Sequence, residues 1–239
     1  MTTRRARLAP WAYGAAVVAG AGLVLFGALV LAPTEKTMGD VQRIFYFHVP
    51  SATNAALAFL AAAVAGAAYL ATRRAAWDAV NRAAVGTGLL FATIVLVTGP
   101  IWARPAWGAW WTWEPRLTTS LIAWLIYLGA LLVRRVAADP EQGARLAAVV
   151  SIVGLLDLPI VYFSVNWWRG AHPMVFGPKG GGLAPGMGAA FALGMLGTTL
   201  LHAALFGLAW REARLADEVA ALERRQDRER EDARAEEIR

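Results

Sequence analysis

Six apolar stretches, each close to the length of a membrane-crossing helix, constrain this chain more than any other feature. A helix needs about 20 mainly apolar residues to cross a hydrocarbon core of roughly 30 Å. Backbone polar groups find no water there, so lone spanning segments must be helical. The sequence therefore predicts an all-α polytopic membrane protein with six transmembrane helices, over Pro10–Leu31, Pro50–Ala71, Ala83–Ile101, Leu117–Val133, Ala147–Val165 and Ala189–Trp210.

Composition agrees with a membrane protein and excludes several other classes. The chain is 58% hydrophobic, against about 45–50% in ordinary globular domains. It has no cysteine, which excludes disulfides, thiolate catalysis and cysteine-ligated metals. The net charge of +6 comes from the membrane body, because the segment after Trp210 is slightly acidic. Nucleic acid is therefore not an expected partner.

The chain divides into a membrane domain, residues 1–210, and a charged tail, residues 211–239. The tail alternates acids and bases, and Leu215, Val219 and Leu222 would form one apolar stripe on a short helix. A solvated cytosolic helix that frays and a docking element for a partner subunit both fit this pattern. The first apolar stretch exceeds the 7–15 residues usual in a signal peptide, so we expect a retained helix.

The distribution of Lys and Arg predicts the orientation of the helices. An even number of spans places both termini on one side. If that side is the cytoplasm, the positive-inside rule is satisfied at every inner segment. The inner segments carry Arg4, Arg5, Arg7, Arg73, Arg74, Arg82, Arg134, Arg135 and Arg145, and the outer loops carry Lys36, Arg43, Arg104, Arg116, Arg169 and Lys179.

The outer loop after the third span is unusually rich in tryptophan. Five tryptophans fall between Trp102 and Trp113. An interfacial aromatic belt is one interpretation, but a belt spreads its aromatics over all helix ends. At helical spacing, Trp107, Trp110 and Trp111 would lie near one another and form a shelf for a flat ring. The loop, about residues 102–118, is therefore a candidate ligand wall, formed by Trp107, Trp110, Trp111 and Trp113.

Two of the three histidines are expected on the same outer face as this loop. His48 precedes the second predicted span, and His172 follows the fifth. Each has aromatic residues and one arginine nearby in the sequence. His202 lies inside the sixth span. Neutral imidazole is a common metal ligand, so His48 and His172 are candidate ligands.

Haem is the ligand that these residue types suit best. Two imidazoles can occupy the axial positions of its iron, and aromatic side chains can cover the porphyrin. The propionates match the guanidinium fork of arginine, which Arg43, Arg116 or Arg169 could supply. Zinc is the competing interpretation, but it takes three or four protein ligands. The outer face offers two histidines, no cysteine and few acids, namely Glu35, Asp40 and Glu114.

Two polar residues inside the spans remain open to more than one interpretation. Asp157 lies near the middle of the fifth span, two residues before Pro159. It could serve a proton path, or bond to backbone groups that the proline leaves free. His202 is a possible partner for Asp157 across the bundle. The glycine-rich run Gly177–Gly182 has no accompanying strand and is interpreted as a loop rather than a phosphate site.

The motif Trp107-Gly-Ala-Trp110-Trp111-Thr-Trp113-Glu114-Pro-Arg116 resembles the signature loop of the haem-handling (WWD) membrane proteins of cytochrome c assembly. Within that group the chain is similar to the haem exporter protein C (CcmC) family. The stretches around His48 and around Tyr162 to His172 resemble the two histidine regions of that family. The resemblance covers roughly residues 10–210. One departure is Glu114, where the family pattern usually has Asp.

The resemblance implies a haem-binding protein rather than an enzyme. It implies non-covalent, transient haem b at the periplasmic face of a bacterial inner membrane, with His48 and His172 as axial ligands. Delivery would be to a membrane-anchored haem chaperone (CcmE-like). Further implied partners are the ATPase and membrane subunits of an ABC transporter (CcmA- and CcmB-like) and a small single-span subunit (CcmD-like), together with membrane lipid.

Two other functions compete with haem handling. A secondary transporter or proton-conducting protein would use Asp157 and His202, but such proteins usually show broken helices and inverted repeats. A true cytochrome c synthase of the larger WWD type would need more spans, more outer histidines or a large soluble domain. The sequence favours a protein that holds haem and hands it on.

Overall fold

The computed structural model describes residues 10–168, 170–173 and 182–237, and these form helices and short connections without a β-strand. An isolated bridge between Glu35 and Gly39 is the only β-type pairing among them. The helices are α1 (Pro10–Phe26), α2 (Phe45–Thr72), α3 (Ala75–Trp107), α4 (Pro115–Val136), α5 (Pro140–Leu155), α6 (Asp157–Trp167) and α7 (Met187–Glu237). A π-helical turn, Gly27–Leu31, continues α1, and a 3-10 turn, Asp40–Ile44, precedes α2.

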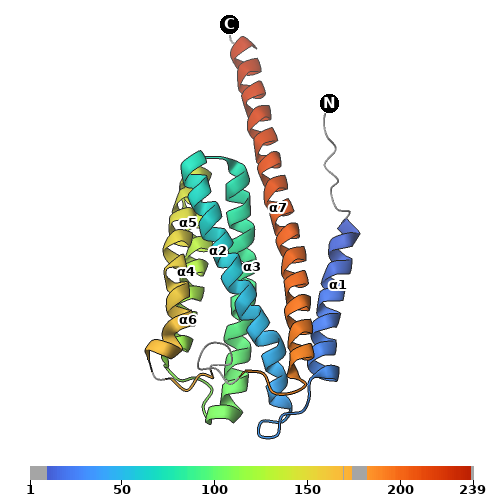
Figure 1. The fold of residues 1–239 in the computed structure, drawn as a ribbon. Helices are drawn as coiled ribbons and strands as arrows, with labels where there is room; N and C mark the ends of the chain where they lie inside the picture. The colour runs from blue at the N-terminus through green and yellow to red at the C-terminus, as the bar shows by residue number, and fades with distance from the viewer. Residues whose placement is uncertain (1–9, 169, 174–181, 238–239) are drawn as a thin grey trace.

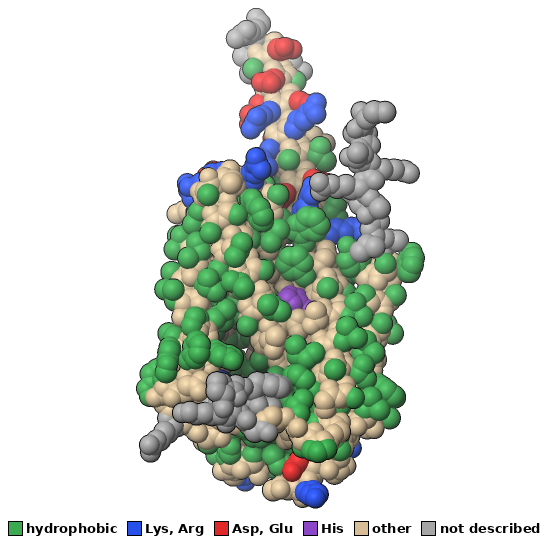
Figure 2. All heavy atoms as spheres, in the orientation of Figure 1, with side chains coloured by type: hydrophobic (Ala, Val, Ile, Leu, Met, Phe, Trp, Pro, Cys, Tyr) green, Lys and Arg blue, Asp and Glu red, His purple; other side chains and the backbone are tan. Residues whose placement is uncertain are grey.

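Six helical segments are long and apolar enough to cross a membrane, which confirms the predicted fold class. The connections 32–44 and 108–114, and the described residues of 168–186, gather at one end of the bundle, here called the loop end (Figure 1). The opposite end, where α7 projects beyond the other helices, is called the tail end. Figure 2 shows a broad apolar surface between the two ends, with Lys and Arg gathered near the tail end.

The helices form two groups that meet along α7. Helices α2 to α6 pack together, and α1 pairs with α7 on the other side (Figure 1). The core of the larger group includes Phe59 of α2, whose ring stacks on that of Tyr127 of α4 at 3.7 Å. In the smaller group, Gly20 and Gly197 face each other, and a Cβ on Gly20 would lie 2.7 Å from the Gly197 carbonyl oxygen. Small residues thus allow α1 and α7 to approach closely.

The second span begins earlier than predicted. We expected Pro50 in a first helical turn, but α2 begins at Phe45 and Pro50 lies inside it. Proline lacks the N–H that would bond the carbonyl four residues earlier. That carbonyl belongs to Tyr46, and Gly194 of α7 packs directly against it. The helix continues through the proline, so His48 lies within the first turn of α2 rather than before it.

The third span also differs from the prediction. Helix α3 continues to Trp107, so Trp102 and Trp107 are helical and only the later tryptophans are in a loop. Gly108 ends the helix with a φ of 76°, a conformation that favours glycine. The predicted helical shelf of Trp107, Trp110 and Trp111 is therefore wrong, because the helix stops before Trp110.

The fifth span is divided into α5 and α6 at Leu156. Pro159 explains the break, because its ring clashes with the carbonyl four residues earlier and it donates no hydrogen bond there. The sixth span and the tail form one continuous helix, α7, as far as Glu237. At the tail end, Arg82 of α3 pairs with Asp217 of α7 at 2.5 Å, which holds the start of the tail against the bundle.

Candidate functional site

The two predicted ligand histidines both lie at the loop end. His48 is held by α2, and His172 lies in the segment that follows α6. Nδ1 of His48 lies 2.7 Å from Oγ1 of Thr98, on the neighbouring helix α3. Within the described residues, Nε2 of His48 makes no hydrogen bond. The ring therefore has one anchored nitrogen and one nitrogen free to bind a ligand.

His172 is held in a similar way by backbone groups. Its Nδ1 lies 3.1 Å from the carbonyl oxygen of Pro173. A carbonyl only accepts, so Nδ1 carries the proton and Nε2 carries the lone pair. The pKa of His172 is lowered to about 4, mainly by burial; the charges of Arg116 and His48 act in the same direction and the hydrogen bond to Pro173 acts against them. His172 is therefore neutral at physiological pH.

Glu114 joins the tryptophan loop to the segment that holds His172. Oε2 of Glu114 accepts a 3.1 Å hydrogen bond from the backbone N–H of His172. Burial raises the pKa of the Glu114 carboxyl, while the backbone N–H groups of His172 and Ala171 and the charge of Arg116 act in the opposite direction. Gly170 is required beside it, since a Cβ there would lie 2.5 Å from Oε2. Glu114 therefore positions a backbone segment.

The tryptophans are divided between the site and the exposed surface. The rings of Trp107 and His172 pack at an angle of 65°, with their centroids 6.2 Å apart. Trp107 also packs edge-on against Trp102, with a centroid distance of 5.4 Å. Trp111 packs edge-on against Trp113 at 5.8 Å. Trp110 and Trp113 are exposed at 59% and 75%. Trp107 is thus the predicted tryptophan that the structure brings against a predicted ligand.

The three predicted arginines have different surroundings. Arg116 donates a 2.8 Å hydrogen bond to the carbonyl oxygen of Tyr162. Arg43 donates to the carbonyl oxygens of Ala28 and Leu29, at 2.8 and 3.1 Å, and also contacts Asp40, so it ties the end of the first span to the 3-10 turn that precedes α2. Arg169 lies outside the described residues.

Four buried polar atoms between Trp111 and Arg116 have no hydrogen-bond partner within the described residues, and one of them is Oγ1 of Thr112. The other three are Nε1 of Trp111, Oε1 of Glu114 and Nε of Arg116. Buried polar groups are normally paired, so unpaired ones in the loop that holds the backbone of His172 fit a site that a polar-edged ligand completes. No cluster of three or more His, Cys, Asp or Glu occurs in the described chain. The donor set suits two axial ligands better than tetrahedral zinc.

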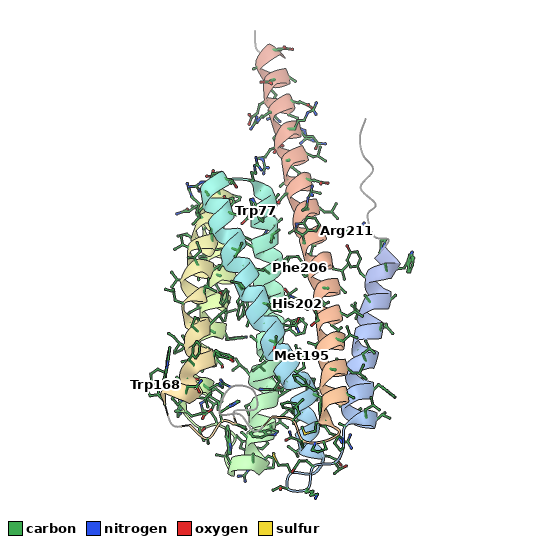
Figure 3. All side chains as sticks on the ribbon, viewed as in Figure 1. Trp77, Trp168, Met195, His202, Phe206 and Arg211 are labelled. Atoms are coloured by element: carbon green, nitrogen blue, oxygen red, sulfur yellow. The ribbon has the colours of Figure 1, made fainter. Side chains whose placement is uncertain are left out.

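His202 and Asp157 do not form the pair that the sequence allows. Nδ1 of His202 lies 3.0 Å from Oδ1 of Asn54, and Nε2 lies 3.3 Å from Oγ1 of Thr87. Figure 3 shows His202 in the lower part of α7, within the apolar part of the bundle. Asp157 is buried at the start of α6, and its Oδ2 has no hydrogen bond to the described residues. His202 thus has polar partners of its own, on α2 and α3.

Sequence reasoning missed Thr98 and Gly170, which contact His48 and Glu114, and it counted Trp102 in the loop without naming it as a wall residue, although Trp102 packs on Trp107. Thr98 and Trp102 are four residues apart, which places them on one face of a helix. That signal was hidden because α3 was expected to end at Ile101. Gly170 carries no signal that distinguishes it from other loop glycines.

Comparison with known proteins identifies the family. The family model described as heme exporter protein C matches residues 1–226. The chain is 37% identical to heme exporter protein C of Bradyrhizobium diazoefficiens over 70% of its length, and 33% identical to heme exporter protein C of Escherichia coli K12 over 68%. It is 36% identical to a putative cytochrome c biosynthesis ccmC-like mitochondrial protein of Marchantia polymorpha over 63%. These matches span 63%, 66% and 63% of the relatives' own lengths. This multi-pass membrane protein therefore belongs to the heme exporter protein C family.

Proposed function

We propose that this protein holds haem at the loop end, with Nε2 of His48 and Nε2 of His172 as the two axial ligands. The observation that carries the proposal is that two imidazoles at the loop end each have Nδ1 held by a neighbouring oxygen and make no Nε2 hydrogen bond within the described residues. The names of the relatives, heme exporter protein C and cytochrome c biosynthesis ccmC-like protein, supply the ligand and the process.

Each nearby side chain has a proposed role in this site. Trp107 covers the ligand beside His172, and Trp110, Trp111 and Trp113 extend an aromatic surface from the same loop. Arg116 is the preferred partner for a propionate, because its Nε is buried without a partner in the described chain. Arg43 and Arg169 stay predictions, and the Arg43 guanidinium already bonds backbone carbonyls.

The protein would present this haem to a partner rather than transform it. Trp110 and Trp113 are exposed, and they offer an aromatic surface to a haem chaperone (CcmE-like). The other proposed partners are the subunits of an ABC transporter (CcmA- and CcmB-like) and a small single-span protein (CcmD-like). Haem b is the proposed form, bound without a covalent bond.

The loop end is proposed to face the periplasm and the tail end the cytoplasm of a bacterial inner membrane. Support comes from the arginines near the tail end, including Arg73, Arg74 and Arg135. Because the chain has no cysteine, single cysteines at positions 109 and 138 report each side. An impermeant maleimide added to intact spheroplasts should label Ala109→Cys and spare Ala138→Cys. The opposite pattern would reverse the orientation.

Haem binding is tested on the purified full-length protein in detergent. The wild type should carry haem b with a six-coordinate, low-spin, bis-histidine spectrum. His48→Ala and His172→Ala should each lose that spectrum, because each removes one axial nitrogen. His202→Ala is the matched control, and it should keep the spectrum since His202 bonds Asn54 and Thr87 within the membrane. Equal effects of all three variants would refute the assignment.

A further inference from the structure

A threonine on α3 anchors the candidate ligand His48. Oγ1 of Thr98 lies 2.7 Å from Nδ1 of His48, although the two residues are 50 positions apart in the sequence. The next residue, Gly99, packs close to the same ring, since a Cβ there would lie 3.5 Å from Cε1 of His48. Helix α3 therefore holds one edge of the imidazole.

The hydrogen bonds of Thr98 favour a proton on Nδ1 of His48. A threonine hydroxyl has one hydrogen to donate. The Thr98 hydroxyl lies 2.7 Å from the carbonyl oxygen of Ile94, which can only accept. With its hydrogen directed to Ile94, the hydroxyl accepts from His48. Nδ1 of His48 must then carry a proton, and Nε2 of the neutral ring carries the lone pair.

We propose that Thr98 is a positioning residue that fixes the tautomer and ring orientation of His48, so that Nε2 is the nitrogen presented to a metal. This role rests on the proposed haem function, and it adds the residue that orients one of the two candidate ligands. Such partners of metal-bound histidines set the ring orientation and raise the basicity of the ligating nitrogen.

The two candidate ligands use different anchors for the same purpose. Nδ1 of His172 is bound by the backbone carbonyl of Pro173, which no side-chain substitution removes. Nδ1 of His48 is bound by a side-chain hydroxyl, which can be removed without changing the shape of the residue. Thr98→Val therefore isolates the anchor of one ligand and leaves the other intact.

Helix α3 also offers a matched control. Thr93 donates its hydroxyl to the carbonyl four residues earlier, at 2.8 Å, as Thr98 does. Its oxygen accepts from Nε1 of Trp124 at 2.9 Å rather than from a histidine. Thr93→Val removes the same chemical group from the same helix without touching either candidate ligand, and Thr98→Ser restores the hydroxyl that Thr98→Val removes.

The first experiment needs no haem. Nitrogen NMR of ¹⁵N-histidine-labelled apoprotein in detergent should show the wild-type His48 ring protonated at Nδ1. Thr98→Val should show a mixture of tautomers or protonation at Nε2, and Thr98→Ser and Thr93→Val should match the wild type. A wild-type ring protonated at Nε2 would overturn the inference whether or not any variant folds.

The second experiment measures haem titrated into the same proteins. Thr98→Val should bind haem about 10–100-fold more weakly, with a larger high-spin fraction, and Thr98→Ser should recover both properties. A Thr98→Val protein that binds like the wild type would overturn the positioning role. If the wild type does not bind haem, or if His48→Ala changes nothing, the proposed function fails instead, and the tautomer measured in the apoprotein still decides the role of Thr98.

Discussion

The backbone N–H of His172 donates a hydrogen bond to Oε2 of Glu114 across 58 positions of sequence, at a distance of 3.1 Å. This bond fastens the segment after α6 to the tryptophan loop between α3 and α4. The Glu114 carboxylate thus connects the segment that contains His172 to the loop that contains Trp110, Trp111 and Trp113.

Glu114→Ala should weaken haem binding by removing this anchor. A hydrogen bond to a charged group contributes about 1.5–3 kcal/mol, so we expect a loss of roughly 10–100-fold in haem affinity, measured by titration. Glu35→Ala is the matched control, because Glu35 also accepts backbone N–H bonds, from Thr37 and Met38, in another loop of the same end. Similar losses in both variants would show a general loop effect.

Gly170→Ala should reproduce much of the effect of Glu114→Ala. A Cβ at position 170 would lie 2.5 Å from Oε2 of Glu114, so the carboxylate must move away from His172. In a Glu114→Ala background the same change should have little further effect, because coupled residues are not additive. Gly188→Ala meets no atom within 4 Å and should bind haem normally. Fully additive losses would argue against the steric explanation.

His172 should stay neutral at pH values well below the usual pKa of histidine. Its pKa falls from 6.5 to about 4 in the folded protein, so the unfolded chain binds more protons between these values. The folded state therefore has its full stability with respect to His172 above pH 6.5, and the free energy of unfolding decreases as the pH falls toward 4. An NMR titration of the apoprotein should give a midpoint near 4. Arg116→Gln should raise it, because the charge of Arg116 lowers the pKa; a wild-type midpoint near 6.5 would refute the burial of this ring.

Gly20→Ala should destabilise the contact between α1 and α7. The added Cβ would lie 2.7 Å from the carbonyl oxygen of Gly197, and backbone cannot easily yield. Overpacking of this kind costs about 1–3 kcal/mol, which thermal unfolding in detergent should detect as a lower Tm. Gly22→Ala, on the same helix with no atom within 4 Å, should not lower the Tm. Equal Tm values for the two variants would mean that α1 and α7 pack differently.

Asp78→Ala should destabilise the tail end strongly. Asp78 and Arg134 pair at 2.6 Å and are both largely buried. Removing one partner of a buried pair costs about 3–5 kcal/mol, measurable as a lower Tm in detergent. Glu229→Ala breaks an exposed pair with Arg225 at a similar distance of 2.9 Å, and it should leave the Tm unchanged. A small effect at Asp78 would show that water reaches this pair.

Hydropathy predicted the number of spans correctly and their ends less well. The predicted span ends at Ile101 because the residues that follow are less apolar. Helix α3 nevertheless continues to Trp107, since backbone hydrogen bonding does not require apolar side chains. The helix ends where Gly108 adopts a positive φ. The aromatic shelf was predicted wrongly for this reason, although Trp107 itself lies beside His172.

The sequence alone determined that six helices cross a membrane and that His48 and His172 lie at the same end. Both follow from segment length and from the alternation of sides at each crossing. Only the tertiary structure decided that Thr98 holds His48, that Glu114 holds the backbone of His172, and that His202 bonds Asn54 and Thr87 rather than Asp157. These contacts join different helices and loops, and their partners depend on how the helices rotate and pack, which local pattern does not encode.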